Sequence, residues 1–133
     1  MSADTELLRQ ARQAAESAYS PYSQAKVGCA LVTESGETHL GCNVENASYG
    51  LTMCAERVAI GKAISEEGPD MRWSRVAVVA LGLEFPPCGA CRQVLAEFAA
   101  EDARVIFLSQ GSPVTMKMKD LLPAEFKADD LRL

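Results

Sequence analysis

Two apolar runs flanking one amphipathic segment constrain the fold more than any other feature of this 133-residue chain. The runs RVAVVALGL (residues 75–83) and RVIFLSQ (residues 104–110) are typical of strands covered on both faces. Between them, PPCGACRQVLAEFAAE (residues 86–101) starts with two prolines and continues with the apolar spacing of a helix. Because strand–helix–strand units with short links place helices over a shared sheet, we expect an α/β layer fold with a mixed or parallel sheet.

The N-terminal third predicts a helix followed by a hairpin. Residues 4–18 repeat their apolar side chains at helical spacing, and Asp4 or Thr5 could cap the helix. Residues 26–44 indicate two strands joined by a turn at Ser35-Gly36.

The rest of the chain adds a helix and a C-terminal edge. MCAERVAIGKAI (residues 53–64) predicts a core-facing helix that ends within SEEGPD (residues 65–70). SPVTMKM (residues 112–118) favours an edge strand, and KDLLPAEF (residues 119–126) a last helical turn. Since no linker, repeat or low-complexity stretch interrupts this order, we expect residues 1–133 to form a single domain.

Charge and hydropathy limit the classes of partner. Thirteen basic and eighteen acidic residues give a formal net charge of -5. This balance argues against nucleic acid as a partner, since proteins gain affinity for polynucleotides by neutralising phosphates. No run reaches the ~18 apolar residues that would span a membrane. The N-terminus lacks the regions of a signal peptide, so we expect a cytoplasmic protein.

Five cysteines are an odd number, and the expected compartment is reducing, so metal or catalytic roles are favoured over disulfides. Cys54 begins one predicted helix, while Cys88 and Cys91 begin the next. The positive end of a helix lowers a nearby thiol pKa, and the thiolate is the form that binds zinc. Two such helices meeting at one edge of a sheet would present three thiolates to one ion.

Three protein ligands are typical of catalytic zinc, whereas structural zinc takes four. Candidates for a fourth ligand lie on the predicted hairpin: Cys29, Cys42 and His39. Glu56 stands two residues after Cys54, on the first turn of the same helix. A carboxylate there can face the open zinc position and transfer a proton from bound water to a leaving group.

The segments Cys54-Ala55-Glu56 and Pro87-Cys88-Gly89-Ala90-Cys91 match the three-cysteine form of the zinc deaminase signature. The wider segments AYSPYS, GCNVENASYG, MCAERVAI, PCGACRQVL and LLPAEF resemble the small homotetrameric cytidine deaminases over almost the whole chain. The resemblance implies a three-layer α/β/α fold with a central mixed five-stranded sheet. It also implies one zinc ion per subunit, and a homotetramer with its sites at subunit interfaces.

By this resemblance the enzyme deaminates cytidine and deoxycytidine, nucleosides of pyrimidine salvage, to uridine and deoxyuridine plus ammonia. The zinc ligands would be Cys54, Cys88 and Cys91. Glu56 would protonate N3 of the base and then the departing amine. The residues implied to bind substrate are Asn43, Glu45, Ala55 and Phe126, with Asn43 and Glu45 on the ribose hydroxyls.

Arg57 has an electrostatic role by the same resemblance. Three thiolates on Zn²⁺ leave a net charge of -1, which weakens the effect of the metal on the acidity of bound water. An arginine that donates hydrogen bonds to the ligand sulfurs withdraws charge from the metal, and such partners commonly change affinity or activity by ~10–100-fold.

One departure bears on the substrate. The family has an aromatic residue stacked on cytosine where PYSQAKVG places Ala25. Such a stack is typically worth ~1–3 kcal/mol, so we expect weaker base binding, a rearranged pocket or a different preferred base. Phe126 matches an aromatic residue that reaches into a neighbouring subunit's site and could partly compensate. Tyr49 matches a position near subunit contacts.

Plainer interpretations exist for several of these residues. Cys29 and Cys42 fit small buried residues on strands, and His39 fits a surface position on a strand. Cys88 and Cys91 alone would suit a redox pair or half of a structural zinc knuckle.

Rival functions follow from the same motifs. A deaminase of a modified cytosine nucleoside, or of a nucleoside antibiotic such as blasticidin S, is suggested by Ala25 and opposed by Asn43 and Glu45. A structural zinc module would need a fourth protein ligand. The acidic balance and the absence of a basic stripe oppose a polynucleotide deaminase.

Overall fold

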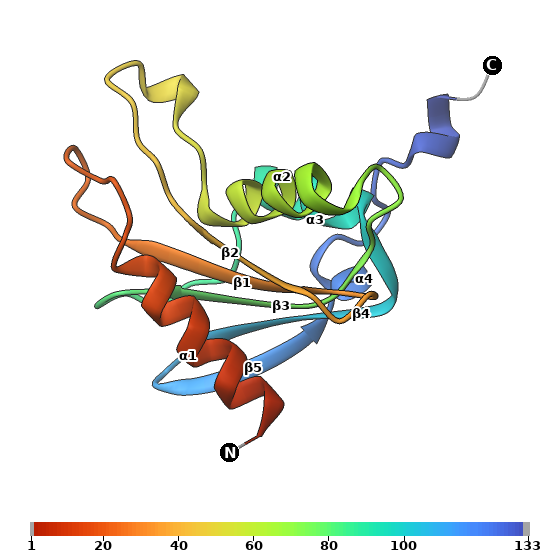
Figure 1. Ribbon diagram of the computed structural model, residues 1–133, viewed down its shortest axis with the longest axis horizontal. Coiled ribbons are helices and arrows are strands. Elements are labelled where there is room, and N and C mark those ends of the chain that lie inside the picture. Colours follow the sequence, from red (N-terminus) through yellow and green to blue (C-terminus); the bar gives the residue numbers. More distant parts are fainter. Residues whose placement is uncertain (1, 132–133) are drawn as a thin grey trace.

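The computed structural model describes residues 2–131, and Figure 1 shows its helices on both sides of one sheet. Its helices and strands are α1 (Ala3–Ala15), β1 (Val27–Thr33), β2 (Thr38–Cys42), α2 (Ala55–Glu67), β3 (Trp73–Ala80), α3 (Gly89–Glu97), β4 (Ala99–Ser109), β5 (Ser112–Lys117) and α4 (Met118–Leu121). Short 3₁₀ turns lie at Tyr49–Leu51 and Ala128–Leu131. None of the described helices is long and apolar enough to cross a membrane.

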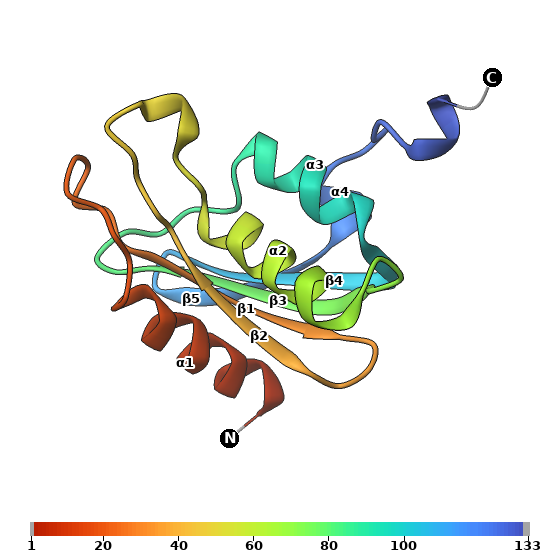
Figure 2. The same cartoon turned by 45° about the horizontal axis from the view of Figure 1, so that its top comes forward.

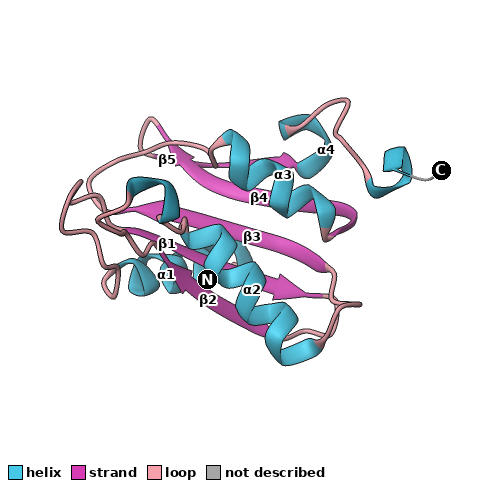
Figure 3. Cartoon of the chain, turned by 90° about the horizontal axis from the view of Figure 1, so that it is seen from above, coloured by secondary structure: helices cyan, strands magenta, loops and turns pink. Residues whose placement is uncertain are grey.

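The sheet has five strands in the order β2-β1-β3-β4-β5 (Figure 3). β3 and β4 are parallel because α3 connects them as a crossover, whereas the other three pairs are antiparallel. The expected mixed five-stranded sheet is therefore confirmed.

Three layers are also confirmed. Helix α1 lies on one face of the sheet, and α2, α3 and α4 lie on the other (Figures 1 and 2). Successive residues of β3 enter opposite core clusters: Val76 and Val78 pack on the side of α2 and α3, while Ala77 and Val79 pack on the side of α1. The continuous apolar run of this strand thus reflects burial on both faces.

Two glycines let helices approach the sheet closely. A Cβ at Gly28 would lie 1.9 Å from the Ala11 carbonyl oxygen of α1. A Cβ at Gly41 would lie 2.5 Å from the Ala55 carbonyl oxygen and 2.7 Å from the Ala59 nitrogen of α2. Because these are backbone atoms, they cannot turn aside as a side chain can. Gly41 therefore sets the height of the first turn of α2 above the sheet.

Some expected boundaries were wrong. Ser2 caps α1, since its side chain accepts a hydrogen bond from the Thr5 nitrogen at 3.0 Å, so neither Asp4 nor Thr5 is the cap. The segment after Pro87 is helical only to Glu97. β4 takes over at Ala99, which pairs with Trp73. Pairing with β3 thus outweighs the helical spacing of the last few residues.

The expectation of a surface position for His39 was also wrong, because its side chain is only 3% exposed. Its Nε2 lies 2.5 Å from a Glu67 carboxylate oxygen, and its Nδ1 lies 3.0 Å from a Glu66 oxygen. Both glutamates lie at the C-terminal end of α2, so a strand histidine fixes that end of the helix to β2.

Substituting Gly41 tests the close approach of α2. We expect Gly41→Ala to lower the free energy of unfolding by about 3 kcal/mol, as overpacking against backbone does, measured by urea denaturation. Gly61→Ala is the matched control, because Gly61 lies on α2 with no heavy atom near its Cβ direction. Equal stability of the two variants would contradict the close packing.

The contacts of Glu67 predict a pH-dependent contribution to stability. Its pKa is lowered from 4.5, first by the hydrogen bond with His39 and then by those from Thr33 and Ser35. A lowered folded pKa stabilises the native state above about pH 4.5, and this contribution is lost as pH falls through the folded value. We expect Glu67→Gln to lower the urea midpoint more at pH 7 than at pH 3. A deficit that is equal at both pH values would refute the ionic contribution.

Candidate metal centre and adjoining pocket

The start of α2 is held in place by backbone hydrogen bonds to the segment that follows β2. Met53 and Val44 form a bridge in which each backbone nitrogen donates to the other's carbonyl oxygen at 2.9 Å. Cys54 follows as the N-cap of α2, with extended backbone angles of φ -73° and ψ 155°. Its sulfur therefore lies at the positive end of the helix, as the sequence predicts.

The start of α3 is fixed by its own first turn. Cys88 is the N-cap, and its sulfur accepts a hydrogen bond from the Cys91 nitrogen at 3.4 Å. Arg92 donates to the carbonyl oxygens of Pro87 at 2.8 Å and Leu121 at 3.0 Å, which fastens this turn to α4. The indole nitrogen of buried Trp73 donates to the Leu95 carbonyl oxygen at 2.8 Å and fixes α3 to the sheet.

The predicted cluster of cysteines is present. The sulfurs of Cys54, Cys88 and Cys91 all lie within 4.8 Å of one another. In a zinc tetrahedron with ~2.3 Å bonds to sulfur, neighbouring sulfurs are about 3.8 Å apart, so the arrangement fits the ion with little movement. Within residues 2–131, neither Cys29, Cys42 nor His39 joins this group of ligand atoms. Cys29 is instead fully buried in the core.

The thiols interact so strongly that they do not ionise alike. The pKa of Cys54 is lowered to about 5, chiefly by a hydrogen bond from the Cys91 thiol and also by Arg57. The pKa of Cys91 is raised, first by its interaction with Cys54 and then by burial. Three adjacent thiolates thus require a cation, which is the chemistry expected of a thiolate metal site.

Arg57 lies beside the sulfurs, as expected. Its Nη2 donates to the Cys54 sulfur at 3.3 Å and to the Thr52 carbonyl oxygen at 3.2 Å. Interaction with Cys54 raises the pKa of Arg57, so the side chain is a permanent positive charge next to this thiolate. These contacts turn the guanidinium toward the cysteine cluster and away from solvent.

Glu56 is one of few buried charged residues, with 4% of its surface exposed. Burial is the largest cause of its raised pKa, and the negative charge of Cys54 adds to it. A carboxyl with a raised pKa changes protonation state more readily near neutral pH, which suits a group that accepts and returns a proton.

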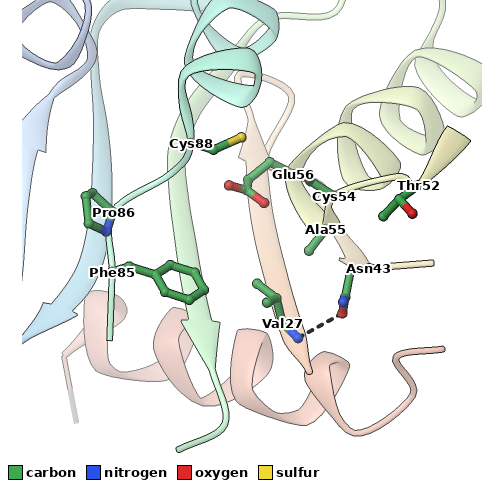
Figure 4. Close-up of a pocket in the computed structure, with 9 residues that line it drawn as sticks. All are labelled: Val27, Asn43, Thr52, Cys54, Ala55, Glu56, Phe85, Pro86 and Cys88. Carbon is green, nitrogen blue, oxygen red and sulfur yellow. Dashed lines mark hydrogen bonds between the residues drawn. The ribbon is translucent and has the colours of Figure 1, made fainter. Parts of the chain in front are cut away.

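A pocket of about 430 Å³ opens beside Glu56 and the sulfurs, a size typical of small-molecule sites (Figure 4). Its lining residues come from several elements: Val27, Asn43, Thr52, Cys54, Ala55, Glu56, Phe85, Pro86 and Cys88. The strand and loop residues Val27 and Asn43 lie on one side of it, and Phe85 and Pro86 on the other (Figure 4).

Of the four expected substrate-binding residues, Asn43 and Ala55 line this pocket. The Asn43 amide accepts from the Val27 nitrogen at 2.9 Å and donates to the Ala25 carbonyl oxygen at 2.8 Å, so its orientation is fixed. Glu45 lies instead in a neighbouring hollow with Tyr22, Ser23, Tyr49 and Thr52, and Thr52 lines both spaces.

Phe126 does not line the pocket of its own chain, and its side chain is 57% exposed. The segment that carries it leads away from the sheet towards the C-terminus (Figures 1 and 2). The Phe126 carbonyl oxygen accepts a hydrogen bond from Gln93 at 3.0 Å, which ties its backbone to α3.

Sequence reasoning missed four lining residues: Val27, Thr52, Phe85 and Pro86. Val27 and Thr52 carry no chemical signal that distinguishes them from ordinary strand and loop residues. Phe85 did carry one, because an aromatic residue stands directly before the proline pair that leads to Cys88.

Comparison with known proteins agrees with this geometry. Residues 1–109 match the family described as the cytidine and deoxycytidylate deaminase zinc-binding region. A cytidine deaminase from Halalkalibacterium halodurans is 47% identical over 127 residues, covering 94% of this chain and 95% of that protein. Another from Mycobacterium tuberculosis is 42% identical over 130 residues, covering 96% of this chain and 93% of that protein.

Solved structures share the fold. The crystal structure of cytidine deaminase from Burkholderia pseudomallei has a TM-score of 0.83 and 43% identity, covering 95% of this chain and all of that one. That of cytidine deaminase from Mycobacterium tuberculosis has a TM-score of 0.80 and 38% identity, covering 95% and 98%. With its trio of cysteines at two helix starts, this chain belongs to the cytidine and deoxycytidylate deaminase zinc-binding family.

Proposed function

We propose that this protein hydrolyses cytidine and deoxycytidine to uridine and deoxyuridine, with release of ammonia. The observation that carries the proposal is a buried carboxylate, Glu56, that lines one pocket together with two of the three clustered cysteines. The 41–47% identity to several cytidine deaminases supports cytidine as the substrate.

We assign the zinc ion to Cys54, Cys88 and Cys91, one ion per subunit. When bound there with one open position, zinc supplies a water molecule activated for attack on C4 of the base. Glu56 would take one proton from that water and deliver it to N3, and it would then move the second proton, from the new C4 hydroxyl, to the departing amine. One water is consumed and one ammonia leaves, so the reaction balances without a further co-reactant.

Asn43 and Glu45 are assigned to the ribose hydroxyls. The pKa of Glu45 is lowered, chiefly by a hydrogen bond from the Ser23 hydroxyl and also by the backbone of Ser23 and Tyr22. Glu45 therefore stays an acceptor at neutral pH, as a sugar hydroxyl requires. Ala55, fully buried, forms part of the pocket wall.

We also propose a homotetramer whose sites lie at subunit interfaces. Large apolar side chains stand exposed on a single chain, including Tyr49 at 73%, Leu51 at 67% and Phe126 at 57%. Such residues are typical of surfaces that another subunit covers. In this arrangement Phe126 reaches the pocket of a neighbouring copy, and its absence from the pocket of its own chain is what that role requires.

The cellular setting is part of the proposal. All five cysteines are free, and three are needed as thiols, which supports a reducing compartment such as the cytoplasm. Residues 1–133 would act as one catalytic domain in pyrimidine salvage, since both core clusters pack on the same sheet.

Glu56→Gln is expected to lower kcat for cytidine by about 10²–10⁴-fold, because the amide cannot carry the proton. Ammonia release and the loss of cytidine absorbance measure the rate. Zinc content should be unchanged, since Glu56 is not assigned as a ligand. Glu97→Gln, which removes an exposed carboxylate near the end of α3, is the control and should keep its rate.

Metal-edge spectroscopy of the same proteins separates the enzyme from a structural zinc module. Three sulfurs and one oxygen fit the open catalytic site, whereas four sulfurs would contradict it.

A panel of cytidine, modified cytosine nucleosides and blasticidin S would test the substrate. We expect cytidine to have the highest kcat/KM.

Arg57→Gln is expected to lower kcat by about 10–100-fold at full zinc occupancy, because a positive charge beside the Cys54 sulfur is lost. The fold should remain, which circular dichroism and the melting temperature would check. Lys62→Gln, exposed on the same helix, is the matched control. A normal kcat for fully loaded Arg57→Gln would show that this charge does not assist turnover.

A further inference from the structure

The pocket contains one aromatic ring among its described lining residues, that of Phe85. The ring points across the cavity toward Val27 (Figure 4), and Glu56 lines the same cavity. Its neighbours in the lining are aliphatic or small, including Val27, Ala55 and Pro86. A flat heterocycle that enters this space to reach Glu56 therefore meets one flat π surface from the described residues of the same chain.

On the opposite side of the pocket, the described lining residues provide no ring. The Ala25 backbone is close, since its carbonyl oxygen accepts a hydrogen bond from Asn43, a lining residue. The Ala25 methyl group is nevertheless not part of the lining. No side chain at this position competes with Phe85 for the face of a bound base.

The backbone around Phe85 is stiff enough to hold the aromatic ring in one place. Pro86 and Pro87 follow it and lead directly to Cys88. Each proline fixes its own φ and restricts the preceding residue to extended conformations, so Phe85 and Pro86 are both restricted. Pro87 is fully buried, which anchors the segment. The Phe85 ring thus has a short, stiff connection to one of the clustered sulfurs.

The Phe85 side chain is 39% exposed although it lines the pocket. An aromatic ring with this much free surface at a cavity wall has contact area left for a ligand. In the core, by contrast, Trp73 and Phe107 are almost fully buried and have none to offer.

We propose that Phe85 is a specificity-determining residue that stacks on the pyrimidine base and so serves as the aromatic wall that Ala25 cannot provide. This inference rests on the proposed function, because the ligand it names is the base of the nucleoside substrate. Stacking holds the base in the ground state and the transition state alike, so it acts on KM more than on kcat.

The test measures uridine binding and cytidine turnover on zinc-loaded protein. Uridine binding by calorimetry reports the stack without the reaction. We expect Phe85→Ala to raise the Kd for uridine and the KM for cytidine by about 5–100-fold, the range for loss of one base–aromatic stack. The kcat should change by less than about threefold.

Two further variants distinguish stacking from apolar contact. Phe85→Tyr keeps the ring and should bind uridine within about twofold of the unaltered protein, whereas Phe85→Leu keeps apolar bulk and should bind about threefold or more weakly. Leu83→Ala is the matched control, since Leu83 is an exposed apolar residue of the same loop that does not line the pocket. Melting temperatures check that each variant is folded.

Each outcome decides one question. If the unaltered protein turns over cytidine while Phe85→Ala keeps its Kd and KM within about twofold, the inference is wrong and the proposed function stands. Equal binding by Phe85→Leu and the unaltered protein would also overturn stacking. If the unaltered zinc-loaded protein neither binds uridine nor deaminates cytidine, the proposed function fails and the inference fails with it.

Discussion

Mutual repulsion among three crowded thiolates is the constraint that the fold must satisfy to build this metal site. The sulfurs of Cys54, Cys88 and Cys91 lie within 4.8 Å of one another, and without a cation one thiol ionises easily while another resists. The fold maintains this unfavourable proximity by placing two helix N-termini together and adding the positive charge of Arg57. A divalent ion relieves the repulsion, so metal binding and local stability are coupled there.

The sheet makes this arrangement possible. The parallel crossover from β3 through α3 to β4 puts α3 on the same face as α2, so the two helices pack side by side. Gly41 sets how closely α2 approaches the sheet, and the hydrogen bond from Trp73 to the Leu95 carbonyl oxygen fixes the position of α3 over the sheet. The metal site is thus positioned by contacts in the core, and the loops add Phe85 and Asn43 to the pocket beside it.

The sequence predicted most of this because its strongest signals are local. Apolar runs identify β3 and β4, and cysteines at helix starts identify the metal cluster. Burial of His39 was not predictable in the same way, since it depends on Glu66 and Glu67, which reach it from a helix far along the chain. Likewise Phe85 enters the pocket because the fold places its loop opposite Val27. The spacing of residues in the sequence does not reveal this contact between distant segments. The predicted end of α3 was wrong because the residues after Glu97 pair with β3, although their apolar side chains are spaced as in a helix.

Helix α2 carries Cys54, Glu56 and Arg57 at one end and the partners of His39 at the other. Its thirteen residues make a rod about 20 Å long. Both ends of α2 contact β2 or the segment that follows it, through the Met53–Val44 bridge and through His39. The helix therefore cannot tilt or shift without breaking one of these contacts. The contacts of His39 with Glu66 and Glu67 therefore help to hold the cysteine end of α2 in place. A substitution at these distant residues can shift the side chains that line the pocket.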